Sequence, residues 1–113
     1  IPASDPSTSA REAFTRETKA ATQTENLRVL AASDVVILAV KPQSMPEVLK
    51  EIKRKITSKH LVVSVAAGIP IEQIADVIGL DRRIVRVMPN TPCLIGASAS
   101  AFAGSTGATE ADL

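Results

Sequence analysis

Three short apolar runs most constrain the fold of this chain of 113 residues. They are Asp34–Val40, Leu61–Val65 and Ile84–Met88, and each is rich in β-branched residues. Strands buried on both faces of a parallel sheet have this continuous apolar pattern, because helices cover both faces. Apolar residues at helical spacing separate the runs, from Ser44 to Ile56 and from Pro70 to Ile78. This alternation predicts successive right-handed crossover units, and therefore an α/β fold with a doubly wound parallel sheet.

Weaker patterns surround these runs and complete the expected order of elements. Ser7–Lys19 is compatible with an outer helix, Ala20–Thr24 with a short strand, and Asn26–Ala32 with one or two helical turns. Ala97–Ala103 is a candidate fourth strand made of small residues. Thr109 is expected to cap a helix that begins near the last residue, because threonine is favoured at that position. The patterns at both ends are typical of a segment cut from a longer chain.

Composition excludes several classes of function. The net charge is +1 and only two aromatic residues occur, so we expect no nucleic-acid partner. No apolar run reaches the ~18 residues of a membrane span and no signal peptide is recognisable, so we expect no membrane partner and a cytoplasmic location. Cys93 and His60 are the only residues of their types. A single cysteine forms neither an internal disulfide nor a cysteine metal site, and His60 is expected in a solvated loop rather than in a catalytic role.

The loops that follow the three apolar runs form the candidate site. They are Ala39–Pro42, Ala66–Gly68 and Met88–Pro92, and in a parallel sheet they lie along one edge. Small residues let a flat ligand approach the backbone, and Lys41 offers a positive charge to a phosphate or carboxylate. Two prolines stiffen the third loop around Asn90. Each loop alone also suits ordinary strand termination or helix–sheet packing, but together they favour a ligand-binding edge.

Three segments resemble pyrroline-5-carboxylate reductase in their order and spacing. They are Ser33–Pro42, Val65–Ile69 and Arg86–Pro92, with the elements Val-Lys-Pro and Met-Pro-Asn-Thr-Pro. The resemblance runs from about Ile1 to the end of the chain. It implies an NAD(P)H-dependent reductase that converts 1-pyrroline-5-carboxylate to L-proline in the last step of proline biosynthesis. The lack of acid–base and metal groupings is compatible with this activity, because the cofactor itself carries hydride chemistry.

The resemblance also implies roles for individual residues. The first loop is expected beside the diphosphate and ribose of the cofactor, and the second beside its nicotinamide. These expected contacts are Ala39, Val40, Lys41, Pro42, Ala66 and Ala67. Asn26 matches a position that contacts the adenosine half, although capping of the following helix is a simpler role for it. Asn90 and Thr91 are expected to border the substrate, and the catalytic residues are expected outside this chain.

Family members contain two parts that this sequence lacks. They begin with a strand and a Gly-x-Gly-x-x-Gly/Ala-type turn that holds the pyrophosphate, and no such turn occurs here. They also have a C-terminal helical half that forms the dimer and supplies most of the substrate pocket. We therefore expect residues 1–113 to form a partial NAD(P)-binding Rossmann-type domain without the first βα unit. Alone, the chain is expected to expose apolar sheet surface, to bind the cofactor weakly and to show no turnover, whereas the full-length form is expected to be a homo-oligomer.

Residues at the end of the second strand of the family fold bear on the choice of cofactor. Asp5 can accept hydrogen bonds from the ribose 2′-hydroxyl, as is typical of NADH binding. The side chains suited to a 2′-phosphate are Ser4, Ser7, Thr8 and Arg11. The resemblance favours NADPH, with NADH as the alternative.

Two other functions fit the same sequence. One is a different NAD(P)-dependent oxidoreductase of this fold, such as an imine reductase or a prephenate-type dehydrogenase. The other is a non-catalytic nucleotide-binding module, or a remnant that does not fold stably. A substrate screen separates the first alternative, and a sharp cooperative melt of a soluble monomer would support the module.

Overall fold

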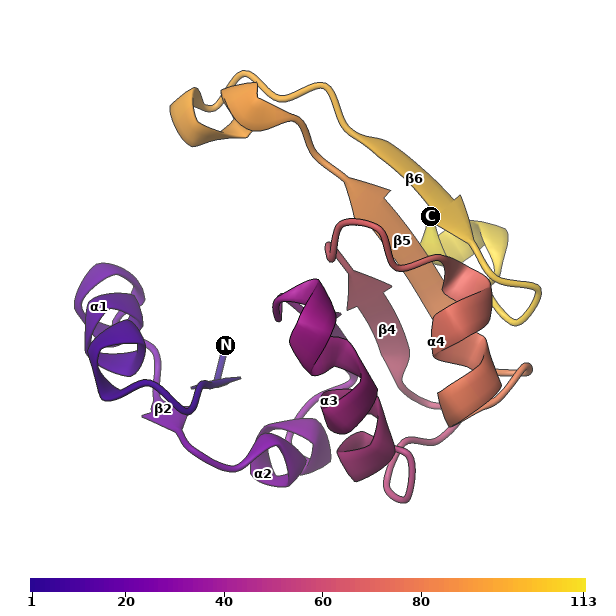
Figure 1. The fold of residues 1–113 in the computed structure, drawn as a ribbon, viewed down its shortest axis with the longest axis horizontal. Helices are drawn as coiled ribbons and strands as arrows, with labels where there is room; N and C mark the ends of the chain where they lie inside the picture. The colour runs from indigo at the N-terminus through magenta and orange to yellow at the C-terminus, as the bar shows by residue number, and fades with distance from the viewer.

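A four-stranded sheet forms the centre of the protein in the computed structural model, which describes residues 1–113 (Figure 1). Its strands, in order across the sheet, are β3 (Val35–Leu38), β4 (Leu61–Ser64), β5 (Arg83–Met88) and β6 (Ala101–Gly104). β3, β4 and β5 are parallel, and β6 runs antiparallel to β5. The strands expected from the three apolar runs are confirmed, and the fourth overlaps the end of its expected range.

Three helices pack against one face of this sheet: α2 (Asn26–Ala31), α3 (Met45–Ile52) and α4 (Ile71–Ile78). A 3-10 turn, η1 (Pro42–Ser44), leads into α3. Apolar side chains of the helices and of the inward-facing strand positions form one buried cluster. Its members include Leu30, Met45, Leu49, Ile52, Ile74, Ala75 and Ile78 from the helices and Leu38, Val62 and Ile84 from the strands. α3 ends before Ile56, contrary to the spacing, yet Ile56 is still buried in this cluster.

The opposite face of the sheet is open at β3. Val35 is 53% exposed and Ile37 is 61% exposed, whereas Leu38 is buried. The expectation that this run is buried on both faces is therefore wrong. Successive side chains of a strand point to opposite faces, and the helices of the buried cluster all cover the other one. The exposed apolar sheet surface expected for the isolated chain is confirmed.

A second sheet contains only two short strands near the N-terminus. β1 (Ala3–Ser4) and β2 (Thr22–Gln23) are parallel, and α1 (Thr8–Thr18) connects them. Ser7 caps α1 by accepting a hydrogen bond from the backbone of the first turn, and Lys19 ends the helix in the left-handed region with φ of 61°. These elements lie within the expected ranges. No residue of α1 is buried, and α2 packs against β1.

Both sheets have a strand edge without a partner. At β1, the N–H groups of Ala3 and Asp5 donate to the carbonyls of Ala21 and Gln23 at 3.1 and 3.2 Å, so the backbone of Ser4 points away from β2. In β3, the carbonyls of Asp34 and Leu38 accept hydrogen bonds from β4 at 2.9 and 3.2 Å. The backbones of Val35 and Ile37 therefore point away from β4. Neither edge is paired with another strand in this chain.

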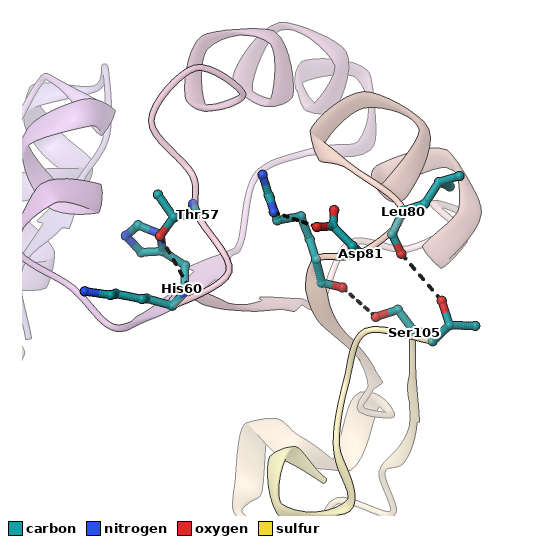
Figure 2. Close-up of polar contacts among 8 residues, drawn as sticks. Thr57, His60, Leu80, Asp81 and Ser105 are labelled. Carbon is teal, nitrogen blue, oxygen red and sulfur yellow. Dashed lines mark hydrogen bonds and ion pairs between the residues drawn. The ribbon is translucent and has the colours of Figure 1, made fainter.

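Short polar contacts hold the loops that precede β4 and β5 (Figure 2). In the turn before β4, Nδ1 of His60 accepts a hydrogen bond from the backbone N–H of Thr57 at 2.9 Å. The expected loop position of His60 is confirmed. Oγ of Ser105 donates to the carbonyl oxygen of Arg82 at 2.8 Å, so the segment after β6 is joined to the turn before β5.

Two 3-10 turns complete the C-terminal part. η2 (Thr91–Ile95) lies in the connection between β5 and β6, and η3 (Glu110–Asp112) ends the chain. Thr109 caps η3 in a reciprocal capping box with Asp112, as the sequence predicts, although this element is one short turn. None of the helices has the length and apolar character required to span a bilayer.

Candidate functional site

The carboxyl ends of β3, β4 and β5 lie along one edge of the sheet. The parallel register pairs Leu38 with Ser64, and Ser64 with Arg86. The backbone N–H of Val65 then donates to the carbonyl of Leu38 at 3.2 Å, just beyond the paired residues. The prediction that the three loops share an edge is confirmed. In Figure 1 the arrowheads of β4 and β5 point toward this edge.

The loop after β3 presents an unpaired cation. Lys41 precedes η1, and its carbonyl accepts a hydrogen bond from the N–H of Ser44 at 2.9 Å. Its side chain is exposed, and the three ion pairs of the chain do not include it. Val40 is half-buried against the core, Ala39 is exposed, and Pro42 opens η1. This loop can therefore offer an ammonium group to an anion while its backbone stays fixed.

The loop after β4 is divided between packing and exposure. Ala66 is buried in the core cluster, so the packing role considered for it is confirmed. Ala67 is exposed, and Gly68 has φ of +71°, a conformation that other residues rarely adopt. Ser64 is fully buried, and its Oγ accepts a hydrogen bond from the N–H of Ala66 at 3.4 Å. Ser64 is not among the residues predicted from the sequence, and its position as the last residue of β4 was the available signal.

The loop after β5 holds Asn90 by its side chain. Oδ1 of Asn90 accepts a hydrogen bond from the N–H of Ala99 at 3.1 Å, which closes the base of the connection to β6. Thr91 begins η2 and is exposed, and no hydrogen bond of its hydroxyl is present. The structure thus places both residues at the expected edge. Their contact with substrate remains a prediction.

Asn26 joins the N-terminal sheet to α3. Its Oδ1 accepts a hydrogen bond from Oγ of Ser4 at 2.7 Å, and its Nδ2 donates to Oε2 of Glu51 at 2.8 Å. Glu25, not Asn26, occupies the cap position of α2, so the capping role considered for Asn26 is wrong. Glu51 is not among the residues predicted from the sequence. This contact depends on how α2 packs against α3, and no local pattern reveals it.

The residues proposed for cofactor choice gather at the start of α1. Oδ1 of Asp5 accepts a hydrogen bond from the N–H of Ser7 at 2.7 Å. Arg11 donates to the carbonyl of Asp5 at 2.6 Å and to Oγ1 of Thr8 at 3.1 Å. No acidic residue lies in the first turn of α1, but the carboxylate of Asp5 and the hydroxyl of Ser7 already accept hydrogen bonds from backbone N–H groups at its N-terminus. No cluster of three or more histidine, cysteine or acidic side chains is arranged to hold a metal ion.

Comparison with known proteins shows the family of the chain. Residues 1–68 match the family model described as NADP oxidoreductase, coenzyme F420-dependent. The chain belongs to this family. Within it, the chain is 43% identical over 90 residues to a pyrroline-5-carboxylate reductase of Methanosarcina acetivorans, covering 80% of this chain and 33% of that protein. It is 46% identical over 84 residues to the pyrroline-5-carboxylate reductase of Arabidopsis thaliana, covering 74% of this chain and 30% of that protein. The chain spans about a third of the length of these relatives.

Solved structures of pyrroline-5-carboxylate reductases share the fold of this chain. It superposes on a pyrroline-5-carboxylate reductase of Coxiella burnetii with a TM-score of 0.91 and 31% identity, over 98% of this chain and 42% of that one. The NADP-bound pyrroline carboxylate reductase of Plasmodium falciparum gives a TM-score of 0.75 and 30% identity, over 84% of this chain and 36% of that one. A prephenate dehydrogenase of Aquifex aeolicus matches at 12% identity and a TM-score of 0.73, which shows a common fold alone. The resemblance to pyrroline-5-carboxylate reductase and the Rossmann-type fold are confirmed.

Proposed function

We propose that this chain is part of the NAD(P)-binding domain of a longer reductase that converts 1-pyrroline-5-carboxylate to L-proline. The observation that carries the proposal is the shared edge of β3, β4 and β5, whose three loops match the reductase motifs in order and spacing. When bound, the reduced nicotinamide supplies a hydride to the imine carbon of the ring, and the ring nitrogen takes up a proton. A cytoplasmic location fits a biosynthetic role of this kind.

The first two loops have the properties that a dinucleotide requires. Lys41 has no acidic partner and can neutralise a phosphate, while Ala39, Val40 and Pro42 provide a narrow backbone approach. Ala67 is exposed at the position proposed for the nicotinamide, and the preceding residue, Ala66, is buried in the core. On this proposal Asn90 and Thr91 border the ring of the substrate, and groups outside these 113 residues complete the catalytic site.

We propose NADPH as the preferred cofactor, with NADH as a usable second one. Arg11 and the hydroxyls of Ser7 and Thr8 lie together at the start of α1, which suits a 2′-phosphate. The carboxylate of Asp5 already accepts a hydrogen bond from the backbone of Ser7, so part of its capacity to bind a ribose hydroxyl is occupied. The NADP-bound relative from Plasmodium falciparum supports the same preference.

The unpaired strand edges support a larger domain. The backbones of Ser4 on β1 and of Val35 and Ile37 on β3 need partners, and the apolar side chains of β3 need a covering helix. We propose that the longer protein contributes the missing βα unit at these edges, together with the glycine-rich turn that holds the pyrophosphate. A helical domain beyond the sheet would then form the homo-oligomer.

The test compares this chain with the complete reductase that contains it. The complete protein is expected to oxidise NADPH in the presence of 1-pyrroline-5-carboxylate and to form L-proline stoichiometrically. The 113 residues alone are expected to show no turnover and to bind NADPH very weakly. Saturable turnover by the isolated chain would overturn the proposal that groups outside these 113 residues complete the cofactor domain and the catalytic site. Inactivity of the complete protein on this imine, with activity on prephenate or on another imine, would favour the other oxidoreductases of this fold.

A further inference from the structure

A hydrogen-bonded relay links α3 to the last residue of β1. Glu51 accepts a hydrogen bond from the amide nitrogen of Asn26 at 2.8 Å, and the amide oxygen of Asn26 accepts one from the hydroxyl of Ser4 at 2.7 Å. The three residues come from α3, α2 and β1, so packing of these elements brings them together. Ser4 and Asn26 are half-buried, and Glu51 is exposed.

The chemistry of Glu51 fixes the direction of both hydrogen bonds. An ionised carboxylate can only accept, so the amide NH₂ of Asn26 must face Glu51. The amide oxygen of Asn26 must therefore face Ser4. A serine hydroxyl has one proton to donate, and Ser4 uses it on Asn26. Toward any further ligand, Ser4 can act only as an acceptor.

This direction selects between the two groups that distinguish the cofactors. A ribose 2′-hydroxyl can donate a hydrogen bond to Ser4, whereas a 2′-phosphate carries mainly acceptor oxygens and negative charge at neutral pH. Ser4 ends β1, which on the proposed function is the second strand of the complete domain, and the ribose is recognised near the end of that strand in dinucleotide folds. While Ser4 donates to Asn26, it has no proton left for a 2′-phosphate, so the donors that remain for that group are Ser7, Thr8 and Arg11.

We propose that Glu51 is a positioning residue for cofactor choice, because it keeps the Ser4 hydroxyl an acceptor and so limits the preference for NADPH over NADH. The proposal rests on the proposed function, since it requires that the cofactor ribose lies against Ser4. Glu51 itself touches neither the ribose nor the reacting atoms. It acts through Asn26.

Replacing the carboxylate by an amide removes this constraint. The side chain in Glu51→Gln can present either its oxygen or its NH₂ group to Asn26, so the amide of Asn26 is free to turn over. Ser4 can then accept from Asn26 and donate its own proton to a phosphate oxygen. Glu47→Gln is the matched control, because Glu47 lies on the same helix, is exposed and forms no side-chain hydrogen bond.

The experiment measures the dissociation constants of NADPH and NADH for the complete reductase, by quenching of nicotinamide fluorescence. Glu51→Gln is expected to shift the affinity ratio toward NADPH about five- to tenfold, the usual effect of one hydrogen bond, with the melting temperature unchanged. Glu47→Gln is expected to leave the ratio unchanged. In a Ser4→Ala background, Glu51→Gln is expected to cause no shift, because the responding hydroxyl is gone.

An equal ratio in the parent protein and in Glu51→Gln would overturn the proposal. So would a shift that persists in the Ser4→Ala background, since it would act through another residue. Glu51→Ala provides a second variant that releases the amide of Asn26, and it is expected to change the ratio in the same direction. Failure of the parent protein to bind either cofactor would instead refute the proposed function.

Discussion

The guanidinium of Arg83 forms two parallel hydrogen bonds with the carboxylate of Asp112. Nε donates to Oδ2 at 3.0 Å, and the second bond joins an Nη atom to Oδ1. Arg83 begins β5 and Asp112 ends the last turn, so the pair joins the C-terminus to the central sheet. The hydrogen bonds from Arg83, followed by one from the backbone of Thr109, hold the pKa of Asp112 well below its usual range.

Because of this ion pair, the stability of the folded protein is expected to depend on pH. The pKa of Asp112 is lower in the folded than in the unfolded protein, so its contribution is complete above the unfolded pKa of about 4 and is lost as the pH falls below it. Asp112→Asn is therefore expected to lower the urea midpoint at pH 7, and the difference from the parent is expected to shrink below about pH 4. Asp81→Asn is the control, because Asp81 forms an ion pair with Arg82 on an exposed turn. An unchanged difference between pH 7 and pH 3 would contradict the role of Asp112.

Adding one methyl group at Gly107 is expected to destabilise the fold. A Cβ atom at this position would lie 2.5 Å from the carbonyl oxygens of Arg82 and Asp81, which are backbone atoms that cannot rotate away. Gly107→Ala is expected to lower the free energy of unfolding by about 1–3 kcal/mol, measured by urea denaturation. Gly104→Ala is the control, because its added Cβ would meet only side-chain atoms at 3.1 and 3.2 Å. A smaller loss for Gly107→Ala than for Gly104→Ala would be inconsistent with this packing.

The open face of β3 predicts self-association of the isolated chain. Ile37→Thr removes apolar surface at the exposed centre of this face but keeps a β-branched residue. We expect less light scattering and less binding of a hydrophobic dye than for the parent chain at equal concentration. Leu80→Thr is the control, since Leu80 is 69% exposed but lies in the turn before β5. Equal reduction by both variants would mean that the face of β3 has no special part in association.

Removing the charge of Lys41 is expected to cause a selective loss of cofactor affinity. Lys41→Gln in the complete reductase is expected to raise the KM for NADPH about tenfold with little change in kcat, because it removes one charged contact to a phosphate. Lys50→Gln on α3 is the control, as Lys50 is also exposed and belongs to no ion pair. A fall in kcat with unchanged KM would place Lys41 in the chemical step instead.

The sequence predicts those features that depend on neighbouring residues along the chain. Continuous β-branched runs locate β3, β4 and β5, and the parallel connections then bring Lys41, Ala67 and Asn90 to one edge. The same runs wrongly predict burial of Val35 and Ile37. An apolar residue shows that a covering surface is favourable, but whether that surface exists depends on other segments.

Contacts between distant elements could not be predicted in this way. The bond from Asn26 to Glu51 depends on the packing of α2 against α3, and the pair of Arg83 and Asp112 depends on the path of the chain after β6. Exposed acidic residues on helices usually face solvent, so nothing in the sequence distinguishes Glu51 from Glu47. Only the three-dimensional arrangement does so.

The separation of the two sheets has a consequence for local unfolding. Every fully buried residue of the protein lies at or after Leu30, and α1 buries none. The first 25 residues therefore contribute no side chain to the central cluster, and the backbone amides of α1 should exchange with solvent long before those of β4. A protease should accordingly trim the N-terminal unit first and leave a resistant body that begins near α2.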